Sequence, residues 1–486
     1  MPRLSFALDS ATRRRLGYEL IDIIDAYFAS LPTRPVQLPL EQRSFEPLHD
    51  ALPETGALDS AANPDELAQF LRETASQLID QGFHVPAANY FGLMNSTPTY
   101  AGVLAETLVA TVNPQLATMA RAQLASKIEA ETLRWIGERF AWQQPFDGTF
   151  TSGGNEANFS GLALALTHHF PSIIEDGVAS IGAQPVLYAS AEAHHSLDKS
   201  AGLLGLGRKA LRRIPVTDRI QLDLNALQHA IRHDRKEGRM PFCVVATAGT
   251  TNSGAIDDLP AIAEICRREN LWLHLDGAYG AAAVFSDTHR PLMRGVELCD
   301  SVTMDPHKWL AVPFACGVIL TRHPQTLHDA FGVATPYMPK TAPGLPLDNF
   351  KVGAQWTRRM NSFKLWLTLK LHGRLAYERH IDRQMQLAAS LAGWTQSSEH
   401  FELATPMFVP ILNSRLKTTT DPDDLARRHL ALVNTVTRDG TRWISETRVA
   451  GRSVLRVMVV SYLTGESQLA GLRNALTDAA EEISRK

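Results

Sequence analysis

The chain has 486 residues, a length that corresponds to about three domains of ordinary size. Hydrophobic residues make up 44% of it and charged residues 20%, which is close to the average for folded globular proteins and excludes disordered and collagen-like chains. The 48 Lys and Arg residues nearly balance the 51 Asp and Glu residues, so the chain lacks the basic excess that is typical of nucleic-acid-binding proteins.

The first 98 residues predict a helical segment. Asp9 or Ser10 can cap a helix that runs to about residue 30, and a second helix is predicted over residues 64–82. The apolar stripe of the first helix packs either on a second subunit or on its own domain; its residues are Leu16, Leu20, Ile23, Ile24 and Tyr27. Met1 is not followed by an apolar signal core, and no stretch approaches the roughly 20 apolar residues of a membrane span. We therefore expect a cytoplasmic protein with no membrane partner.

Residues 99–362 predict a large α/β domain. A helical pattern over residues 101–140 is followed by short apolar runs that alternate with helical stretches as far as residue 322. Such alternation is typical of a mostly parallel, doubly wound sheet that binds ligands at the carboxyl ends of its strands. The predicted strands are residues 148–151, 186–190, 211–216, 242–248, 271–276, 301–305 and 316–321.

Residues 363–486 predict a small α+β domain, after a loop rich in Pro and Gly at residues 336–353. A long helix is expected over residues 363–393, strands at 401–404, 408–412 and 454–460, a helix from residue 421, and a closing amphipathic helix. The cysteines form no C-x-x-C pair, which favours reduced, buried thiols; they are Cys243, Cys266, Cys299 and Cys316.

Three motifs in the α/β segment carry chemistry when they are taken together. Residues 151–158 read Thr-Ser-Gly-Gly-Asn-Glu-Ala-Asn between a strand and a helix, where free N–H groups and the helix dipole favour a phosphate. Asp276 ends an apolar strand, so its carboxylate should face a cation or a proton donor. Lys308 follows another strand, and a lysine with apolar neighbours can lose its proton and form a Schiff base. Taken separately, each motif is better explained by an ordinary structural role: a strand-to-helix turn, a helix-capping Asp and a solvated lysine.

Pyridoxal phosphate needs a phosphate cradle, an acid at its ring nitrogen and an amine for its aldehyde, and the three motifs supply one each. At this point the sequence resembles the group II pyridoxal-phosphate-dependent amino-acid decarboxylases, the family of aromatic-amino-acid and glutamate decarboxylases. The most specific stretch is Asp305-Pro306-His307-Lys308-Trp309, and the resemblance runs from about residue 60 to the end. It implies the fold of aspartate aminotransferase.

The resemblance also implies roles for single residues. Lys308 matches the lysine that holds the cofactor, Asp276 matches the acid at the ring nitrogen, and His194 matches the histidine that stacks on the ring. A surface histidine in a polar turn is the other reading of His194, and it is the one that we keep for His195. The remaining cofactor-binding matches are Ser152, Gly153, Gly154, Asn155, Thr251 and His307.

Substrate-binding residues are implied in the same way. Arg456 resembles the arginine that binds the substrate carboxylate, although an arginine at a strand end with an acidic neighbour fits the pattern equally well. Met94 belongs to a segment, residues 90–96, whose apolar side chains favour an aromatic or other neutral amino acid; core packing would explain them too. Tyr337 matches a loop tyrosine that protonates the carbon from which carbon dioxide leaves, and its alternative is an ordinary exposed tyrosine.

The expected activity is decarboxylation of an L-amino acid to its amine by a homodimer whose N-terminal helices interlock. One alternative keeps the cofactor but releases an aldehyde by decarboxylation-coupled oxidative deamination, or breaks a bond at Cβ. A lesser alternative is a non-catalytic interaction protein on the same fold, and the set of Asp276, Lys308 and His194 argues against it.

Overall fold

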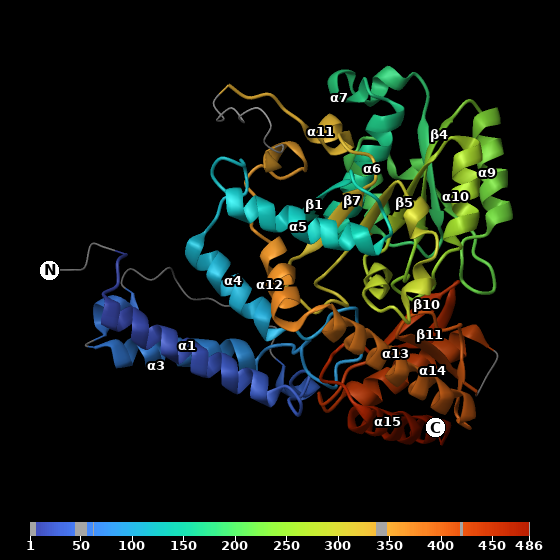
Figure 1. Ribbon diagram of the computed structural model, residues 1–486. Helices are drawn as coiled ribbons and strands as arrows, with labels where there is room; N and C mark the ends of the chain where they lie inside the picture. The colour runs from blue at the N-terminus through green and yellow to red at the C-terminus, as the bar shows by residue number, and fades with distance from the viewer. Residues whose placement is uncertain (1–5, 44–55, 62, 337–347, 418–420, 486) are drawn as a thin grey trace. The chain divides into compact units, whose positions relative to one another are not determined.

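The computed structural model describes residues 6–43, 56–61, 63–336, 348–417 and 421–485 (Figure 1). Unit 1 comprises residues 1–91, 430–444 and 463–486, and unit 2 comprises residues 92–429 and 445–462. Each unit is described by itself. Helix α14 (Pro422–Thr437) runs across the division between them.

Unit 1 contains the N-terminal and C-terminal helices. Helix α1 (Ser10–Ser30) begins where the Asp9 side chain accepts a hydrogen bond from Thr12 N–H, as the sequence predicts. It lies beside α3 (Pro64–Asp80), and the buried carboxylate of Glu19 on α1 joins the two helices through Arg72 at 2.5 Å. The predicted stripe of α1 is only half-buried, and its Leu20 is exposed. Unit 1 also contains the short α2 (Ala57–Ser60) and the closing α15 (Glu466–Ser484).

Unit 2 is built on a seven-stranded sheet in the order β1-β7-β6-β5-β4-β2-β3. The neighbouring pairs from β3 to β6 are parallel, whereas β7 runs antiparallel to both β6 and β1, which confirms a mostly parallel sheet. Its strands are β1 (Asp147–Thr151), β2 (Pro185–Ser190), β3 (Leu211–Ile214), β4 (Met240–Thr247), β5 (Trp272–Asp276), β6 (Ser301–Met304) and β7 (Gly317–Thr321).

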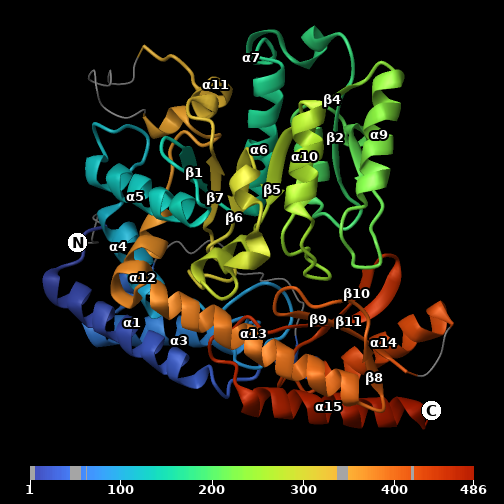
Figure 2. The same cartoon turned by 45° about the vertical axis from the view of Figure 1, so that its right-hand side comes forward.

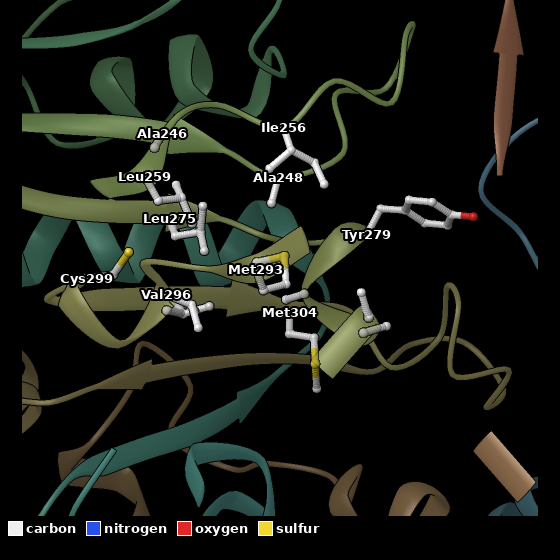
Figure 3. Close-up of a cluster of buried hydrophobic side chains, with 14 of the residues drawn as sticks. Ala246, Ala248, Ile256, Leu259, Leu275, Tyr279, Met293, Val296, Cys299 and Met304 are labelled. Atoms are coloured by element: carbon white, nitrogen blue, oxygen red, sulfur yellow. The ribbon is translucent and has the colours of Figure 1, made fainter. Parts of the chain in front are cut away.

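Helices cover both faces of this sheet, which explains why strands such as β2, β4 and β7 are largely apolar. On β4, Cys243 and Val245 pack in the cluster that contains the apolar residues of α6 (Gly154–His169). The alternating Val244 and Ala246 pack on the opposite face with α10 (Leu259–Glu269), which lies beside α9 (Leu224–Lys236) in Figures 1 and 2. Figure 3 shows part of this second cluster.

The other long helices of unit 2 are α4 (Tyr100–Val112), α5 (Gln123–Arg139), α12 (Ser362–His372) and α13 (Arg374–Ser397). The single helix predicted over residues 363–393 is therefore wrong, because Gly373 adopts φ 75° and ψ 166° and interrupts it. Shorter helices are α7 (Ile173–Asp176), α8 (Ser196–Leu203) and α11 (Thr326–Phe331).

A second, four-stranded antiparallel sheet has the order β10-β11-β9-β8. Its strands are β8 (Phe401–Leu403), β9 (Ile411–Leu416), β10 (Ser445–Val449) and β11 (Arg452–Met458). Strand β10 is absent from the sequence prediction because its residues, Ser-Glu-Thr-Arg-Val, show no apolar alternation. The prediction also places β9 three residues too early.

The four cysteines are free and buried, as the sequence predicts. Within the described ranges, no helix is both long and apolar enough to cross a membrane.

Candidate active site

A cavity of about 250 Å³ opens in unit 2 where strands β4, β5 and β6 end. Thr247 is the last residue of β4, Asp276 is the last residue of β5, and Asp305 follows β6 directly. The cavity thus lies at the carboxyl ends of parallel strands, where the sequence predicts a ligand. Its lining residues are Met94, Gly154, Asn155, Asn158, His194, Thr247, Gly249, Thr251, Asp276, Ala278, Tyr279, Asp305 and Lys308.

Lys308 is paired with a buried carboxylate. Its Nζ lies 3.1 Å from Oδ2 of Asp305, a residue that is only 2% exposed. Gly154 makes room for this carboxylate, since a Cβ at position 154 would lie 2.7 Å from the same oxygen. Asp305 belongs to the lysine motif of the sequence, where no role was predicted for it. A carboxylate three residues before the lysine was the available signal.

Asp276 accepts hydrogen bonds on both carboxylate oxygens. Asn158 Nδ2 donates to Oδ2 at 2.9 Å, and the backbone N–H of Ala278 donates to Oδ1 at 3.2 Å. Asn158 is buried in α6 and is a second site residue that sequence reasoning missed. It is the last residue of the 151–158 motif, and its place in that motif was the available signal.

His194 borders the cavity as a neutral imidazole. Its Nδ1 accepts a hydrogen bond from the backbone N–H of Ser196 at 3.1 Å, so the proton of the ring is on Nε2. Partial desolvation by the surrounding protein lowers the pKa of the ring, and the nearby Asp276 carboxylate offsets part of that effect. His195 lies at the surface beside Asp198, with its side chain 94% exposed.

Three buried polar atoms of lining residues have no hydrogen-bond partner within the described part of the chain: Thr247 Oγ1, Tyr279 Oη and Asp305 Oδ1. Tyr279 stacks on Trp309 with ring centroids 5.1 Å apart, and Figure 3 shows its ring extending away from the other labelled side chains. Buried polar groups are nearly always paired in folded proteins. These atoms indicate that the cavity is built for a polar ligand.

Other predicted site residues lie beside the cavity lining. The Ser152 N–H and hydroxyl both donate to Glu156 Oε2, at 2.8 and 2.7 Å. Gly153 lies next to His307, whose Cε1 would be 3.2 Å from a Cβ at position 153. The Nδ1 of His307 accepts from Cys316 N–H at 3.0 Å, and burial lowers the pKa of this ring.

Arg456 is 6% exposed on β11 and reaches the loop that carries Thr251. Its Nη1 donates to the Thr251 carbonyl at 3.1 Å and to Asn252 Oδ1 at 3.0 Å, and its Nε donates to Ser445 Oγ at 3.1 Å. Met94 lines the cavity, whereas the neighbouring Leu93 is exposed. Tyr337 lies outside the described residues.

Comparisons with known proteins agree on one family. Residues 53–417 match the pyridoxal-dependent decarboxylase conserved domain. An aromatic-L-amino-acid decarboxylase from Bacillus atrophaeus is 29% identical over 98% of this chain and 97% of its own length. A phenylacetaldehyde synthase from Arabidopsis thaliana is 26% identical over 99% of this chain and 98% of its own length. The crystal structure of mouse CSAD superposes with a TM-score of 0.88 at 25% identity, over 97% of this chain and 99% of that one.

Proposed function

Because the chain belongs to the pyridoxal-dependent decarboxylases and is therefore a pyridoxal-phosphate-dependent carboxy-lyase, we propose that it converts an L-amino acid with an aromatic or other neutral side chain to its amine and carbon dioxide. The observation that carries the proposal is the meeting of Lys308, Asp276 and His194 around one cavity that also holds partnerless polar atoms. The carboxyl ends of parallel strands meet at one edge of the sheet, which brings these groups together.

The residues of the cavity fit the cofactor. When bound, pyridoxal phosphate supplies a positively charged ring that accepts the electrons of the breaking bond. Lys308 binds its aldehyde, and Asp276 holds the proton on its ring nitrogen. The phosphate binds at the start of α6, where Ser152, Gly153, Gly154 and Asn155 precede or begin the helix, with His307 beside them. Asp305 keeps the Lys308 ammonium in place before the cofactor arrives.

The remaining predicted residues would contact the cofactor and the substrate. His194 and Thr251 line the cavity, where His194 would stack on the cofactor ring and Thr251 would lie beside the substrate. Arg456, already hydrogen-bonded to the Thr251 carbonyl, binds the substrate carboxylate from the side of the small sheet. Tyr337 donates the proton that replaces carbon dioxide.

The charges of the cavity support a neutral substrate side chain. Among the described lining residues, Lys308 is the only lysine or arginine, and the lowered pKa of His194 favours the uncharged form of its ring. A second carboxylate on the substrate would have no charge partner next to Asp276 and Asp305. The apolar Met94 offers contact to an aromatic or aliphatic side chain instead.

A second candidate is decarboxylation-coupled oxidative deamination, which gives an aldehyde. The similarity to a phenylacetaldehyde synthase over nearly the whole chain favours keeping it. Cleavage of a bond at Cβ is the remaining variant on the same cofactor.

Product analysis separates these reactions. The cofactor-loaded enzyme is incubated under air with a panel of amino acids, and the products are identified by mass spectrometry. An amine that is lighter than its parent by one carbon dioxide supports the proposal, and an aldehyde or a Cβ-cleavage product contradicts it. A preference for glutamate or aspartate would overturn the substrate class. Lys308→Ala should abolish turnover, whereas Lys199→Ala, at an exposed position, serves as the matched control.

We also propose a homodimer in the cytoplasm. Helix α4 exposes several large apolar side chains of the kind that a second subunit covers; they are Leu104, Leu108 and Val112. A monomeric mass by light scattering would contradict the dimer. Four buried, free cysteines are compatible with a reducing compartment, and a recovery in the membrane or secreted fraction would contradict the location.

A further inference from the structure

Strand β5 presents three polar or aromatic side chains, Trp272, His274 and Asp276, on one face, because alternate residues of a strand point the same way. That face is the one covered by α6, which supplies Asn158. The neighbouring β6 is in register, with Ser301 opposite His274. A buried line of polar groups therefore runs along the sheet to the Asp276 carboxylate.

The orientation of Asn158 is fixed by its neighbours. A carboxylate oxygen only accepts hydrogen bonds, so the amide nitrogen of Asn158 must face Asp276 Oδ2, at 2.9 Å; it also donates to Ser196 Oγ at 3.0 Å. The amide oxygen consequently faces His274 Nε2, at 3.1 Å. Because an amide oxygen cannot donate, the hydrogen is on His274 Nε2.

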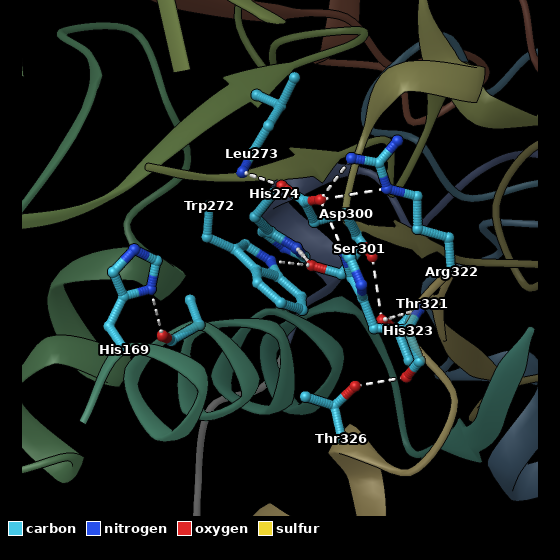
Figure 4. A network of polar contacts seen from close by, with 11 residues as sticks. His169, Trp272, Leu273, His274, Asp300, Ser301, Thr321, Arg322, His323 and Thr326 are labelled. Atoms are coloured by element: carbon cyan, nitrogen blue, oxygen red, sulfur yellow. Dashed lines mark hydrogen bonds and ion pairs between the residues drawn. The ribbon is translucent and has the colours of Figure 1, made fainter. Parts of the chain in front are cut away.

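The other side of the imidazole agrees with this tautomer. His274 Nδ1 lies 2.8 Å from Ser301 Oγ, which in turn accepts from Trp272 Nε1–H at 2.8 Å (Figure 4). The indole has only a donor, so the Ser301 hydroxyl is free to donate to Nδ1. Burial lowers the pKa of His274 to about 4, and a neutral ring has one hydrogen to place. The hydrogen bonds therefore all run in one direction, from Trp272 through Ser301, His274 and Asn158 to the Asp276 carboxylate.

The protein holds the His274 ring tightly against α6. A Cβ at position 161 would lie 2.3 Å from the ring Cε1 and 2.5 Å from Nδ1, so only glycine leaves space for the imidazole. The ring is completely buried and hydrogen-bonded at both nitrogens. It cannot turn without breaking the line.

We propose that Asn158, oriented by the Nε2–H tautomer of His274, is a positioning residue that aims the Asp276 carboxylate at the ring nitrogen of the cofactor. The alternative arrangement, with the Asn158 amide turned over, would put two acceptor oxygens 2.9 Å apart and would require a protonated Asp276. A protonated Asp276 could not hold a proton on the ring nitrogen. The inference rests on the role proposed for Asp276.

The test uses the enzyme freed of cofactor and measures its equilibrium affinity for two probes by fluorescence quenching. The probes are pyridoxal phosphate and its 1-deaza analogue, in which a C–H replaces the ring nitrogen. Asn158→Leu should weaken the binding of pyridoxal phosphate by roughly 10-fold, the effect of losing one hydrogen bond to a charged group, and should change the affinity for the analogue by less than about twofold. A merely structural role would weaken the binding of both probes alike.

Two variants of His274 provide a matched pair. The amide nitrogen of glutamine is as many bonds from Cβ as the imidazole Nε2, so His274→Gln keeps a donor for Asn158; the amide of asparagine reaches only as far as Nδ1. We expect His274→Gln to retain the preference for pyridoxal phosphate over the analogue and His274→Asn to lose it. Equal losses for both probes, or an unchanged preference in Asn158→Leu and His274→Asn, would overturn the proposal. If the wild-type enzyme binds pyridoxal phosphate no more tightly than the analogue, both this proposal and the role of Asp276 are overturned. The proposed decarboxylation would still stand in that case.

Discussion

Because Gly161 of α6 lies against the His274 ring, Gly161→Ala should destabilise the wild-type chain but stabilise a chain that lacks this ring. Gly161→Ala places a methyl group 2.3 Å from Cε1 of an imidazole that is buried and hydrogen-bonded at both nitrogens. The ring must move, and its bonds to Asn158 and Ser301 must lengthen. In a His274→Ala background the same methyl group enters space that the ring has left.

The magnitude follows from two opposing contributions. Extra volume in a packed core costs about 1–3 kcal/mol, and the strained hydrogen bonds place this site at the upper end, near 3 kcal/mol. Replacing a glycine inside a helix by alanine raises the free energy of unfolding by about 1 kcal/mol. Gly161→Ala should therefore lower the free energy of unfolding by about 2 kcal/mol in the wild-type chain and raise it by about 1 kcal/mol in His274→Ala. The coupling between the two positions is thus about 3 kcal/mol.

Urea unfolding of the four chains of this double-mutant cycle, followed by tryptophan fluorescence at one protein concentration, measures the coupling. Trp272 lies in the same hydrogen-bonded line and reports on the region. Destabilisation of the same size in both backgrounds would show that the methyl group meets something other than the His274 ring, and the reasoning would fail.

Three further substitutions test other features. Arg358→Met leaves the buried Glu129 without its partner at 2.7 Å and should lower the free energy of unfolding in urea by about 3–5 kcal/mol. The double variant with Glu129→Leu should recover most of the loss, and an equally unstable double variant would contradict this. Burial raises the pKa of Asp257 to about 6 from 3.8, so the folded chain binds a proton more tightly than the unfolded chain, and stability falls as pH rises from about 4 to 6. Relative to Asp257→Asn, the wild-type chain should lose up to about 3 kcal/mol of unfolding free energy over this range. Parallel pH profiles of the two chains would refute this prediction. Gly373→Ala should destabilise the chain by about 1–3 kcal/mol because residue 373 adopts a φ of 75°. Gly393→Ala should stabilise the chain, because residue 393 lies inside α13 and its added Cβ would have no atom within 4 Å. Melting temperatures that shift in the same direction for both variants would contradict this prediction.

The sequence by itself determined the seven strands of the large sheet and the motifs at their ends. Most of these strands are short, largely apolar runs between helical stretches, and such runs are recognisable because both faces of the sheet are covered. Lys308, Asp276, Gly154 and Asn155 were found because each follows or ends such a run, and the carboxyl ends of parallel strands meet at one edge. Elements without apolar contrast were missed or misplaced, as β10 and the break at Gly373 show. The division of the chain at residues 98 and 362 stays a prediction.

Only the tertiary structure decided which polar side chains support the site. Asn158, His274 and Ser301 come from α6, β5 and β6, and nothing in their sequence spacing indicates that they form one hydrogen-bonded line ending at Asp276. The same is true of Asp305, whose carboxylate reaches Lys308 because Gly154, about 150 residues earlier, leaves room for it. Local sequence determines the period and polarity of an element. Hydrogen bonds between buried groups depend on differences of a few tenths of an ångström in donor–acceptor distance, and those distances are set only after the sheet and its covering helix have packed.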